Sequence, residues 1–188
     1  MLLSHLDQYK QYKQKGFVIF IVLIFMQVFI LLNWYAINDI LLLTKFSKNA
    51  ADHEFQLYQA KKLLAHIELA IMEENPSCVI AFEASSLLLA NPLSWWQAKG
   101  CSGNFQMFKY YYVVEPLTTD SCVSIERIKQ AVADYFRITL FFHSTNNDTR
   151  IFLQSTLVKP RVNTSTPTCT GQLHPVQLGR QSWRELVY

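Results

Sequence analysis

The sequence predicts an α+β fold in which a long N-terminal helix begins in a membrane and packs its outer half on an antiparallel sheet of at least three strands. Three patterns in the 188 residues support this prediction. The chain has a long apolar run near its N-terminus. This run continues into a segment with apolar residues at helical spacing, and the second half of the chain contains segments in which apolar and polar residues alternate.

The apolar run extends from Phe17 to Ile37, where Gln27 and Asn33 are the only strongly polar side chains. A helix of about 20 residues crosses the roughly 30 Å of hydrocarbon in a bilayer. The residues before the run carry more basic than acidic groups, with Lys10, Lys13 and Lys15 against Asp7. Basic flanks stay in the cytoplasm, so we expect one crossing, with the N-terminus inside and the remaining residues on the far side.

The apolar run has three interpretations. A cleaved secretory signal has a core of only about 7 to 15 apolar residues followed by small residues, whereas this run is longer and leads into Asn33-Trp34-Tyr35. An uncut signal anchor needs only length and flanking charge, and both are present. The third interpretation follows from the position of Gly16, which stands where the basic residues end and the apolar run starts with Phe17.

This junction resembles the processing site of type IV prepilins. In that family a dedicated prepilin peptidase cuts after the glycine on the cytoplasmic side and methylates the new N-terminal residue, usually phenylalanine. The resemblance implies a leader of residues 1–16, with Gly16 and Phe17 as the processing residues, and a transmembrane segment of residues 17–37.

The fifth residue after the expected cut is Ile21, where major pilins have a glutamate. A carboxylate inside a bilayer is costly and normally persists only with a partner, which in pilins is thought to be the new amine of a neighbouring subunit. A chain without it fits poorly as the repeating subunit of a fibre. Minor pilins of the PilX type and GspK-type tip pseudopilins of type II secretion lack this glutamate.

Four further segments resemble parts of PilX-type proteins. Residues 133–139 and 151–156 resemble the paired strands that close the globular part in that family, and residues 112–115 resemble the strand before them. The segment from Gly179 to Leu186 resembles a family tail in which Gly-Arg leads into Ser-Trp-Arg. The resemblance therefore implies a pilin-like architecture.

Beyond the membrane span, apolar residues at helical spacing form one stripe, which only His53 interrupts. The stripe consists of Phe46, Ala50, Leu57, Ala60, Leu64, Ile67 and Ile71. We expect one helix from Phe17 to about Glu74, ended by Asn75-Pro76, with residues 38–75 as its part outside the membrane. The stripe has two compatible roles: it covers the sheet of its own domain, and, from Ile21 to Ile71, it provides an assembly surface for similar helices.

Residues 76–158 are expected to form the globular α+β part. Turns are predicted at Asn91-Pro92 and Lys99-Gly100, and Trp95-Trp96 is expected in the core rather than as a carbohydrate platform. Strand signals begin at Phe108 and are expected to stop before Pro116.

Two further strands are predicted from alternation. Phe136, Ile138, Leu140 and Phe142 alternate with other residues, as in a strand with one face in the core. After a loop at residues 144–149, residues 150–158 return as its partner, with Ile151, Leu153 and Leu157 on one face. Residues 159–188 show no periodicity and are predicted to form an irregular tail, with Trp183 as an anchor for its end.

The four cysteines, Cys78, Cys101, Cys122 and Cys169, all follow the membrane span. An even number of cysteines on the far side of the membrane fits two disulfides, which persist in oxidising compartments. Four cysteines allow three pairings, and sequence alone does not choose among them. We favour Cys78 with Cys101, closing the segment after the helix, and Cys122 with Cys169, attaching the tail to the domain. Buried free thiols are the alternative.

Composition and motifs indicate no chemistry. The formal net charge of +3 is small and scattered, so it implies no nucleic-acid partner. The chain has only five glycines and no glycine-rich phosphate loop, Gly-x-Ser-x-Gly or His-Glu-x-x-His motif. No two cysteines lie within four residues of each other, and only His174 follows one closely, so we expect no metal and no cofactor. We expect a protein that is not an enzyme.

The resemblance leads us to expect a PilX-type minor pilin in the inner membrane, with a periplasmic C-terminal domain, that joins the pilus after assembly. The resemblance implies that it helps to prime fibre assembly and sits at or near the tip. The implied partners are minor pilins of the PilV, PilW and FimU kinds, a tip adhesin of the PilY kind, the prepilin peptidase and the inner-membrane platform. The alternatives are a type II secretion tip pseudopilin and an uncleaved single-pass periplasmic anchor protein.

Overall fold

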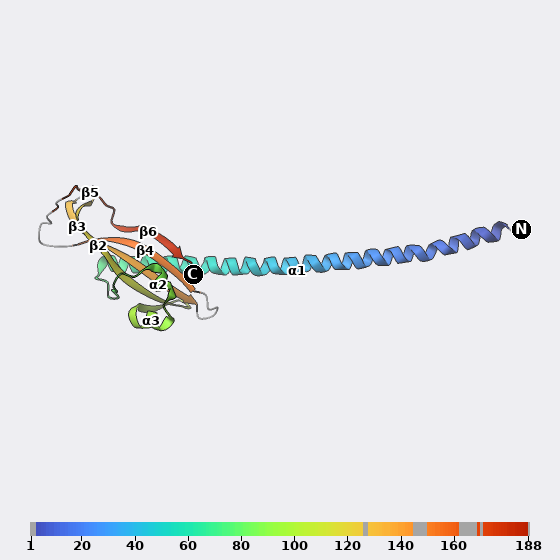
Figure 1. The fold of residues 1–188 in the computed structure, drawn as a ribbon, viewed down its shortest axis with the longest axis horizontal. Helices are drawn as coiled ribbons and strands as arrows, with labels where there is room; N and C mark the ends of the chain where they lie inside the picture. Colours follow the sequence, from blue (N-terminus) through green and yellow to red (C-terminus); the bar gives the residue numbers. More distant parts are fainter. Residues whose placement is uncertain (1–2, 126–127, 145–149, 162–168, 170, 188) are drawn as a thin grey trace. The chain divides into compact units, whose positions relative to one another are not determined.

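A computed structural model of the chain describes residues 3–125, 128–144, 150–161, 169 and 171–187, and the side chains of all of these except residues 3–16, 128–130 and 144. The chain divides into two compact units, residues 1–53 and residues 54–188. The first helix, α1 (Leu3–Glu73), contributes to both units (Figure 1). The two units are described in turn.

The described part of the first unit is entirely helical. Its side chains from Phe17 to His53 are all exposed, and one helix near the N-terminus is long and apolar enough to cross a membrane once. The helix already includes residues 3–16, where we expected it to start only at Phe17. Leucine, lysine and glutamine are good helix formers, and this segment contains no proline to interrupt the helix. At the other end, Asn75 and Pro76 follow the last helical residue closely, as predicted.

The second unit contains the end of α1, two short helices and a sheet. The short helices are α2 (Ser85–Ala90) and α3 (Leu93–Lys99). The strands are β1 (Cys101–Phe105), β2 (Phe108–Ile125), β3 (Ile128–Ser144), β4 (Arg150–Pro160), β5 (His174–Pro175) and β6 (Gly179–Leu186). In the described residues the order is β1-β2-β3-β4-β6 with antiparallel neighbours, and β5 pairs with β2 in parallel. The α+β prediction with an antiparallel sheet is confirmed, with more strands than the minimum of three.

One face of the sheet is covered by the last five turns or so of α1. The predicted alternation places Ile138 and Leu140 of β3 and Leu153 of β4 on this face, and all three side chains are fully buried. The helix contributes Leu57, Ala60, Leu63, Leu64, Ile67 and Ile71 to the same cluster. Burying one such aliphatic side chain stabilises a fold by about 1.5–3 kcal/mol, so this contact is a main source of stability for the domain.

The opposite face of the sheet is also covered, whereas the alternation predicted only one core face. Leu88 of α2 and Trp96 of α3 are fully buried against Val113, Phe141 and neighbouring residues. The Trp96 ring lies 5.4 Å from the Phe141 ring, between centroids, and 5.2 Å from the Trp95 ring. Trp96 is thus a core residue, as expected, and the two short helices explain why Phe141 is buried on the second face.

Strand β2 continues through Pro116 to Ile125, so the prediction that the strand stops there is wrong. On the side of β2 away from β3, Val114 exchanges backbone hydrogen bonds with Cys78 and Ile80, each 2.9 Å. Successive residues of a strand direct their N–H groups to alternate sides, so position 116 faces the same side as Val114. A proline there removes no hydrogen bond to β3, and the register with β3 shifts just after it, between Pro116 and Thr118.

The prediction of an irregular tail over residues 159–188 is wrong for its second half, because β6 pairs antiparallel with β4 from Gly179 to Leu186. Most side chains of β6 are exposed, so an apolar alternation is missing from its sequence. Trp183 lies opposite Ser155 and under the ammonium group of Lys61, which is 4.6 Å from the ring centroid. Residues 162–168 and 170 of the predicted tail, and residues 145–149 of the predicted loop, lie outside the described residues.

Candidate assembly surface

A long run of exposed apolar side chains lies on α1 in the first unit. The segment from Phe17 to Asn38 contains no charged residue, and the first charge after it is Asp39. Gly16 lies within the helix, Phe17 is 67 % exposed and Ile21 is 38 % exposed. Exposed apolar surface of this extent marks an interaction site, and the helix is long and apolar enough to cross a membrane.

The predicted stripe divides between two environments. Leu57, Ala60, Leu64, Ile67 and Ile71 are all buried in the core of their own domain. Phe46 and Ala50 are exposed on the helix before it. The five buried residues therefore cover the sheet and are not available to another subunit, which limits an assembly surface to the exposed part of α1 before Leu57.

Polar contacts attach the outer part of α1 to the sheet at two places that sequence reasoning missed. The Arg180 guanidinium of β6 lies 2.6 Å from a carboxylate oxygen of Glu68, which is largely buried. The Lys159 ammonium of β4 donates hydrogen bonds of 2.8 and 2.6 Å to the carbonyl oxygens of Ile71 and Glu74. The last turn of α1 has no basic residue of its own, so Lys159 supplies the positive charge that a helix C-terminus favours.

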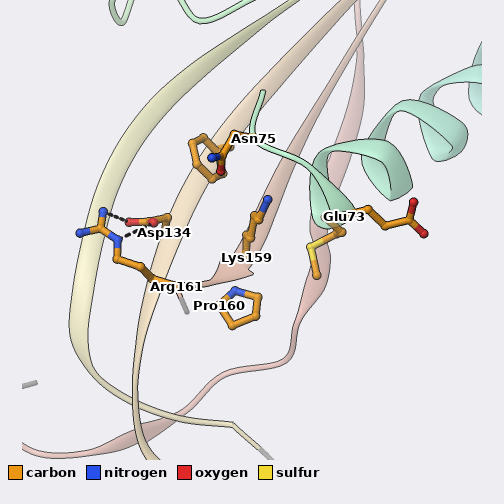
Figure 2. A pocket seen from close by; sticks show the side chains of 8 residues that line it. Glu73, Asn75, Asp134, Lys159, Pro160 and Arg161 are labelled. Carbon is orange, nitrogen blue, oxygen red and sulfur yellow. Dashed lines mark hydrogen bonds and ion pairs between the residues drawn. The ribbon is translucent and has the colours of Figure 1, made fainter. Parts of the chain in front are cut away.

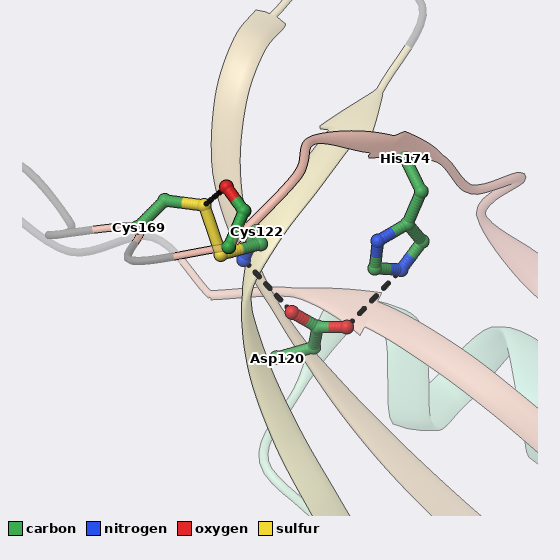
Figure 3. Close-up of a disulfide and its surroundings, with 5 residues drawn as sticks. Asp120, Cys122, Cys169 and His174 are labelled. Carbon is green, nitrogen blue, oxygen red and sulfur yellow. Dashed lines mark hydrogen bonds and ion pairs between the residues drawn. A yellow bond between two sulfur atoms is a disulfide. The ribbon is translucent and has the colours of Figure 1, made fainter.

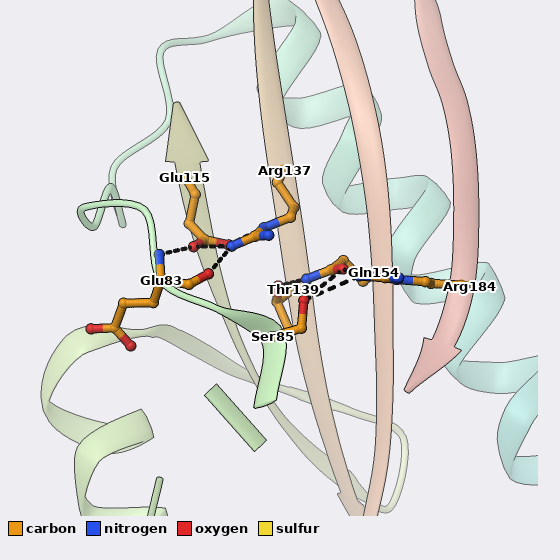
Figure 4. A network of polar contacts seen from close by, with 7 residues as sticks. All are labelled: Glu83, Ser85, Glu115, Arg137, Thr139, Gln154 and Arg184. Atoms are coloured by element: carbon orange, nitrogen blue, oxygen red, sulfur yellow. Dashed lines mark hydrogen bonds and ion pairs between the residues drawn. The ribbon is translucent and has the colours of Figure 1, made fainter. Parts of the chain in front are cut away.

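On the other face, a buried ion pair joins β2 and β3 (Figure 4). Arg137 donates hydrogen bonds of 2.7 and 2.6 Å to the two carboxylate oxygens of Glu115, whose side chain is fully buried. Arg137 also contacts the Glu83 carbonyl oxygen, and the Glu83 N–H donates to Glu115 at 2.9 Å. Each carboxylate oxygen thus has a partner, which is what allows a charge to remain in the core.

A second network lies on the same face (Figure 4). The Gln154 carbonyl oxygen accepts hydrogen bonds from Arg184 at 3.0 and 2.7 Å and from the Ser85 hydroxyl at 3.2 Å. The Gln154 amide donates to the Thr139 hydroxyl at 3.0 Å. This network links β3, β4 and β6 to the start of α2.

The polar residues of these contacts belong largely to the segments that resemble PilX-type proteins. Arg137, Gln154, Arg180 and Arg184 all lie in those segments, and each bonds to an element other than its own. Their occurrence in these segments was the sequence signal that could have pointed to the contacts. The partners Glu68, Glu83 and Ser85 could not be identified in this way, because they are distant in sequence. In this structure the motif residues hold elements together.

A cavity of about 640 Å³ lies where α1 ends against β3 and β4 (Figure 2). Its lining residues are Met72, Glu73, Asn75, Asp134, Phe136, Lys159, Pro160 and Arg161. Partial burial by itself raises the pKa of the Asp134 carboxyl. Hydrogen bonds from Arg161 and Thr119, with the charges of Arg161 and Lys159, outweigh this effect and lower the pKa below that of an ordinary aspartate. Asp134 and Arg161 are paired at 2.5 Å and Lys159 is bound to α1, so these three charges of the cavity wall are occupied by structural contacts.

The structure contains two disulfides, Cys78–Cys101 and Cys122–Cys169, which are the two pairs favoured from the sequence. Their Cα atoms are 5.5 and 5.0 Å apart. Beside the second disulfide, the Asp120 carboxylate accepts a hydrogen bond from the Cys122 N–H at 2.8 Å and lies 3.1 Å from the His174 ring (Figure 3). The disulfide and this contact together attach the region around β5 to β2.

Comparison of the chain with known protein families, with curated proteins and with solved structures finds no match. Within the described residues, no three histidine, cysteine, aspartate or glutamate side chains lie close enough together to hold a metal ion. The candidate surface for a function is the exposed apolar part of α1.

Proposed function

We propose that this chain is a minor pilin subunit resembling the PilX type. The observation that carries the proposal is the uncharged run that starts at the Gly16–Phe17 junction and lies on a helix whose side chains are all exposed up to His53. The same helix continues into a domain where it packs on an antiparallel sheet, an arrangement that resembles the pilin architecture.

In this role the chain is made as a precursor in the inner membrane, with its C-terminal domain in the periplasm, and the prepilin peptidase cuts after Gly16 and methylates Phe17. The subunit then leaves the bilayer by exchanging lipid contacts for contacts with the apolar helices of other minor pilins. It helps to prime fibre assembly on the inner-membrane platform and sits at or near the tip, with a tip adhesin of the PilY kind. Ile21 in place of a glutamate favours this role over that of the repeating fibre subunit.

The test is the N-terminus of the mature protein, measured by mass spectrometry after expression with a prepilin peptidase. We expect the wild-type chain to begin with N-methylated Phe17 and to lack residues 1–16. The variant Gly16→Val should keep the whole leader, while the matched variant Gln14→Ala, inside the leader, should still be cut. Both variants leave the described core unchanged, because no buried residue lies before Gln56 in the part whose side chains are described.

A wild-type chain that keeps Met1 in the presence of the peptidase contradicts the proposal and supports an uncut anchor. A cut chain that co-purifies with type II secretion pseudopilins, and not with minor pilins, supports a GspK-type tip pseudopilin. The three roles are therefore separated by two measurements on the same sample.

A further inference from the structure

Polar side chains in the exposed part of α1 differ in their hydrogen bonds. The Asn33 amide donates to the Phe29 carbonyl oxygen of its own helix at 2.9 Å, and the Thr44 hydroxyl donates to the Ile40 carbonyl oxygen at 2.7 Å. Gln27 has no such bond to any residue that the structure describes. Its carboxamide therefore keeps both donor and acceptor groups available.

The position of Gln27 gives this unpaired amide a high free-energy cost inside a bilayer. Gln27 is the central residue of the span from Phe17 to Ile37, so its Cα lies about 15 Å along the helix from either end of the span. At that depth no water is present, and an amide without a hydrogen-bond partner carries a large desolvation cost. A second transmembrane helix with a polar group at the same depth relieves this cost.

We propose that two copies of this chain associate inside the bilayer through reciprocal hydrogen bonds between their Gln27 side chains. The carboxamide both donates and accepts, so the same group on two parallel helices is self-complementary, as a two-fold symmetric contact requires. Every copy inserts with the same orientation, because the basic flank stays on one side. Gln27 of each copy therefore lies at the same depth as Gln27 of the other.

The helix face around Gln27 suits this contact. Residues at heptad spacing on both sides are large, apolar and exposed: Phe20, Leu23, Ile30 and Trp34. Parallel membrane helices pack through such seams, and one polar residue within a seam fixes the register of the pair. The proposal rests on membrane insertion alone and does not require cleavage at Gly16 or the pilin role.

The experiment is sedimentation equilibrium of the uncut full-length chain in density-matched detergent micelles, which gives the monomer–dimer constant directly. We expect the wild type to dimerise and Gln27→Leu to weaken the dimer by about 3- to 20-fold, as for other hydrogen bonds between membrane helices. The matched control is Asn33→Leu, which removes an amide that is already bonded within its own helix and should leave the constant unchanged. Circular dichroism and retained disulfides show that each variant is folded.

Three results would overturn the proposal: a monomeric wild type, equal constants for the wild type and Gln27→Leu, or an equal loss in Asn33→Leu. If the wild type is monomeric and associates only when another minor pilin is added, the partner of Gln27 is that subunit and not a second copy. The chain tested is uncut, so failure here leaves the mass-spectrometric test of the pilin role unaffected, and failure of that test leaves this one unaffected.

Discussion

Gly179 is the residue at which the backbone most clearly dictates the amino acid. It begins β6 with a φ of 91°, a left-handed conformation that L side chains rarely adopt. No atom of the residues that the structure describes lies within 4 Å of the position that a Cβ would occupy, so space is not the constraint. The glycine is required by backbone conformation alone, and the following residue, Arg180, depends on it to reach Glu68.

We predict that Gly179→Ala destabilises the domain by about 1–2 kcal/mol, because an L residue in the left-handed region carries that cost. The measurement is urea unfolding of the full-length protein in detergent, followed by tryptophan fluorescence. The matched control is Gly171→Ala: among the described residues a Cβ there meets only the Cys122 sulfur, at 3.6 Å, and the backbone is not left-handed. Equal unfolding midpoints for the two variants would contradict this explanation.

Among the structural elements, the two disulfides close loops of different length. Cys122–Cys169 spans a sequence separation of 47 residues and encloses the end of β2 and all of β3 and β4, whereas Cys78–Cys101 spans 23 residues. A cross-link over a longer loop removes more conformational entropy from the unfolded chain. The longer loop should therefore contribute more to stability.

We predict that replacing both Cys122 and Cys169 by serine lowers the free energy of unfolding by about 4 kcal/mol, and that replacing both Cys78 and Cys101 lowers it by about 3 kcal/mol. Each pair is replaced together so that no free thiol remains. The check is denaturant unfolding of the two variants and the wild type under the same oxidising conditions. A larger loss from the Cys78–Cys101 pair would show that local native contacts outweigh loop length.

The elements also show where sequence reasoning succeeds and where it fails. Strands β3 and β4 were predictable because one face of each is buried under α1, which imposes alternation on residues such as Ile138 and Leu153. Strand β6 was not, because it is held by backbone pairing and by Arg180 and Arg184, while most of its side chains are exposed. Helices α2 and α3 have only six and seven residues, too few for a helical period to stand out.

The candidate assembly surface, too, could be predicted from the sequence only in part. Its apolar character and its start near Gly16 are readable because length and charge are properties of the sequence itself. The division of the predicted stripe at Leu57 was not readable, because both halves have the same apolar spacing. Only the sheet, built from residues far along the chain, determines which half is covered.

For the molecule as a whole, the buried residues with described side chains all belong to the second unit and begin at Gln56. We predict that a chain without residues 1–53 is soluble without detergent and melts within about 5 °C of the domain in the full-length protein, a shift of about 1 kcal/mol or less. Thermal unfolding followed by circular dichroism provides the measurement.

A second truncation, starting at Ile67, is the contrasting case. It removes Leu57, Ala60, Leu63 and Leu64 and uncovers the sheet face around Leu140 and Leu153. That chain should aggregate or fail to give a cooperative transition. If it behaves like the longer fragment, α1 is not the main cover of the sheet.

The continuity of α1 has a mechanical consequence. Tension on its apolar part reaches the domain through residues 54–73, whose side chains interdigitate with the sheet along several turns. Pulling along the axis of a helix loads these contacts in shear, so many must yield together instead of separating one by one. Lys159 donates hydrogen bonds to the carbonyl oxygens of Ile71 and Glu74 at the C-terminal end of the helix, and the Cys78–Cys101 disulfide follows a few residues later. These bonds oppose the separation of the helix from the sheet of its own domain.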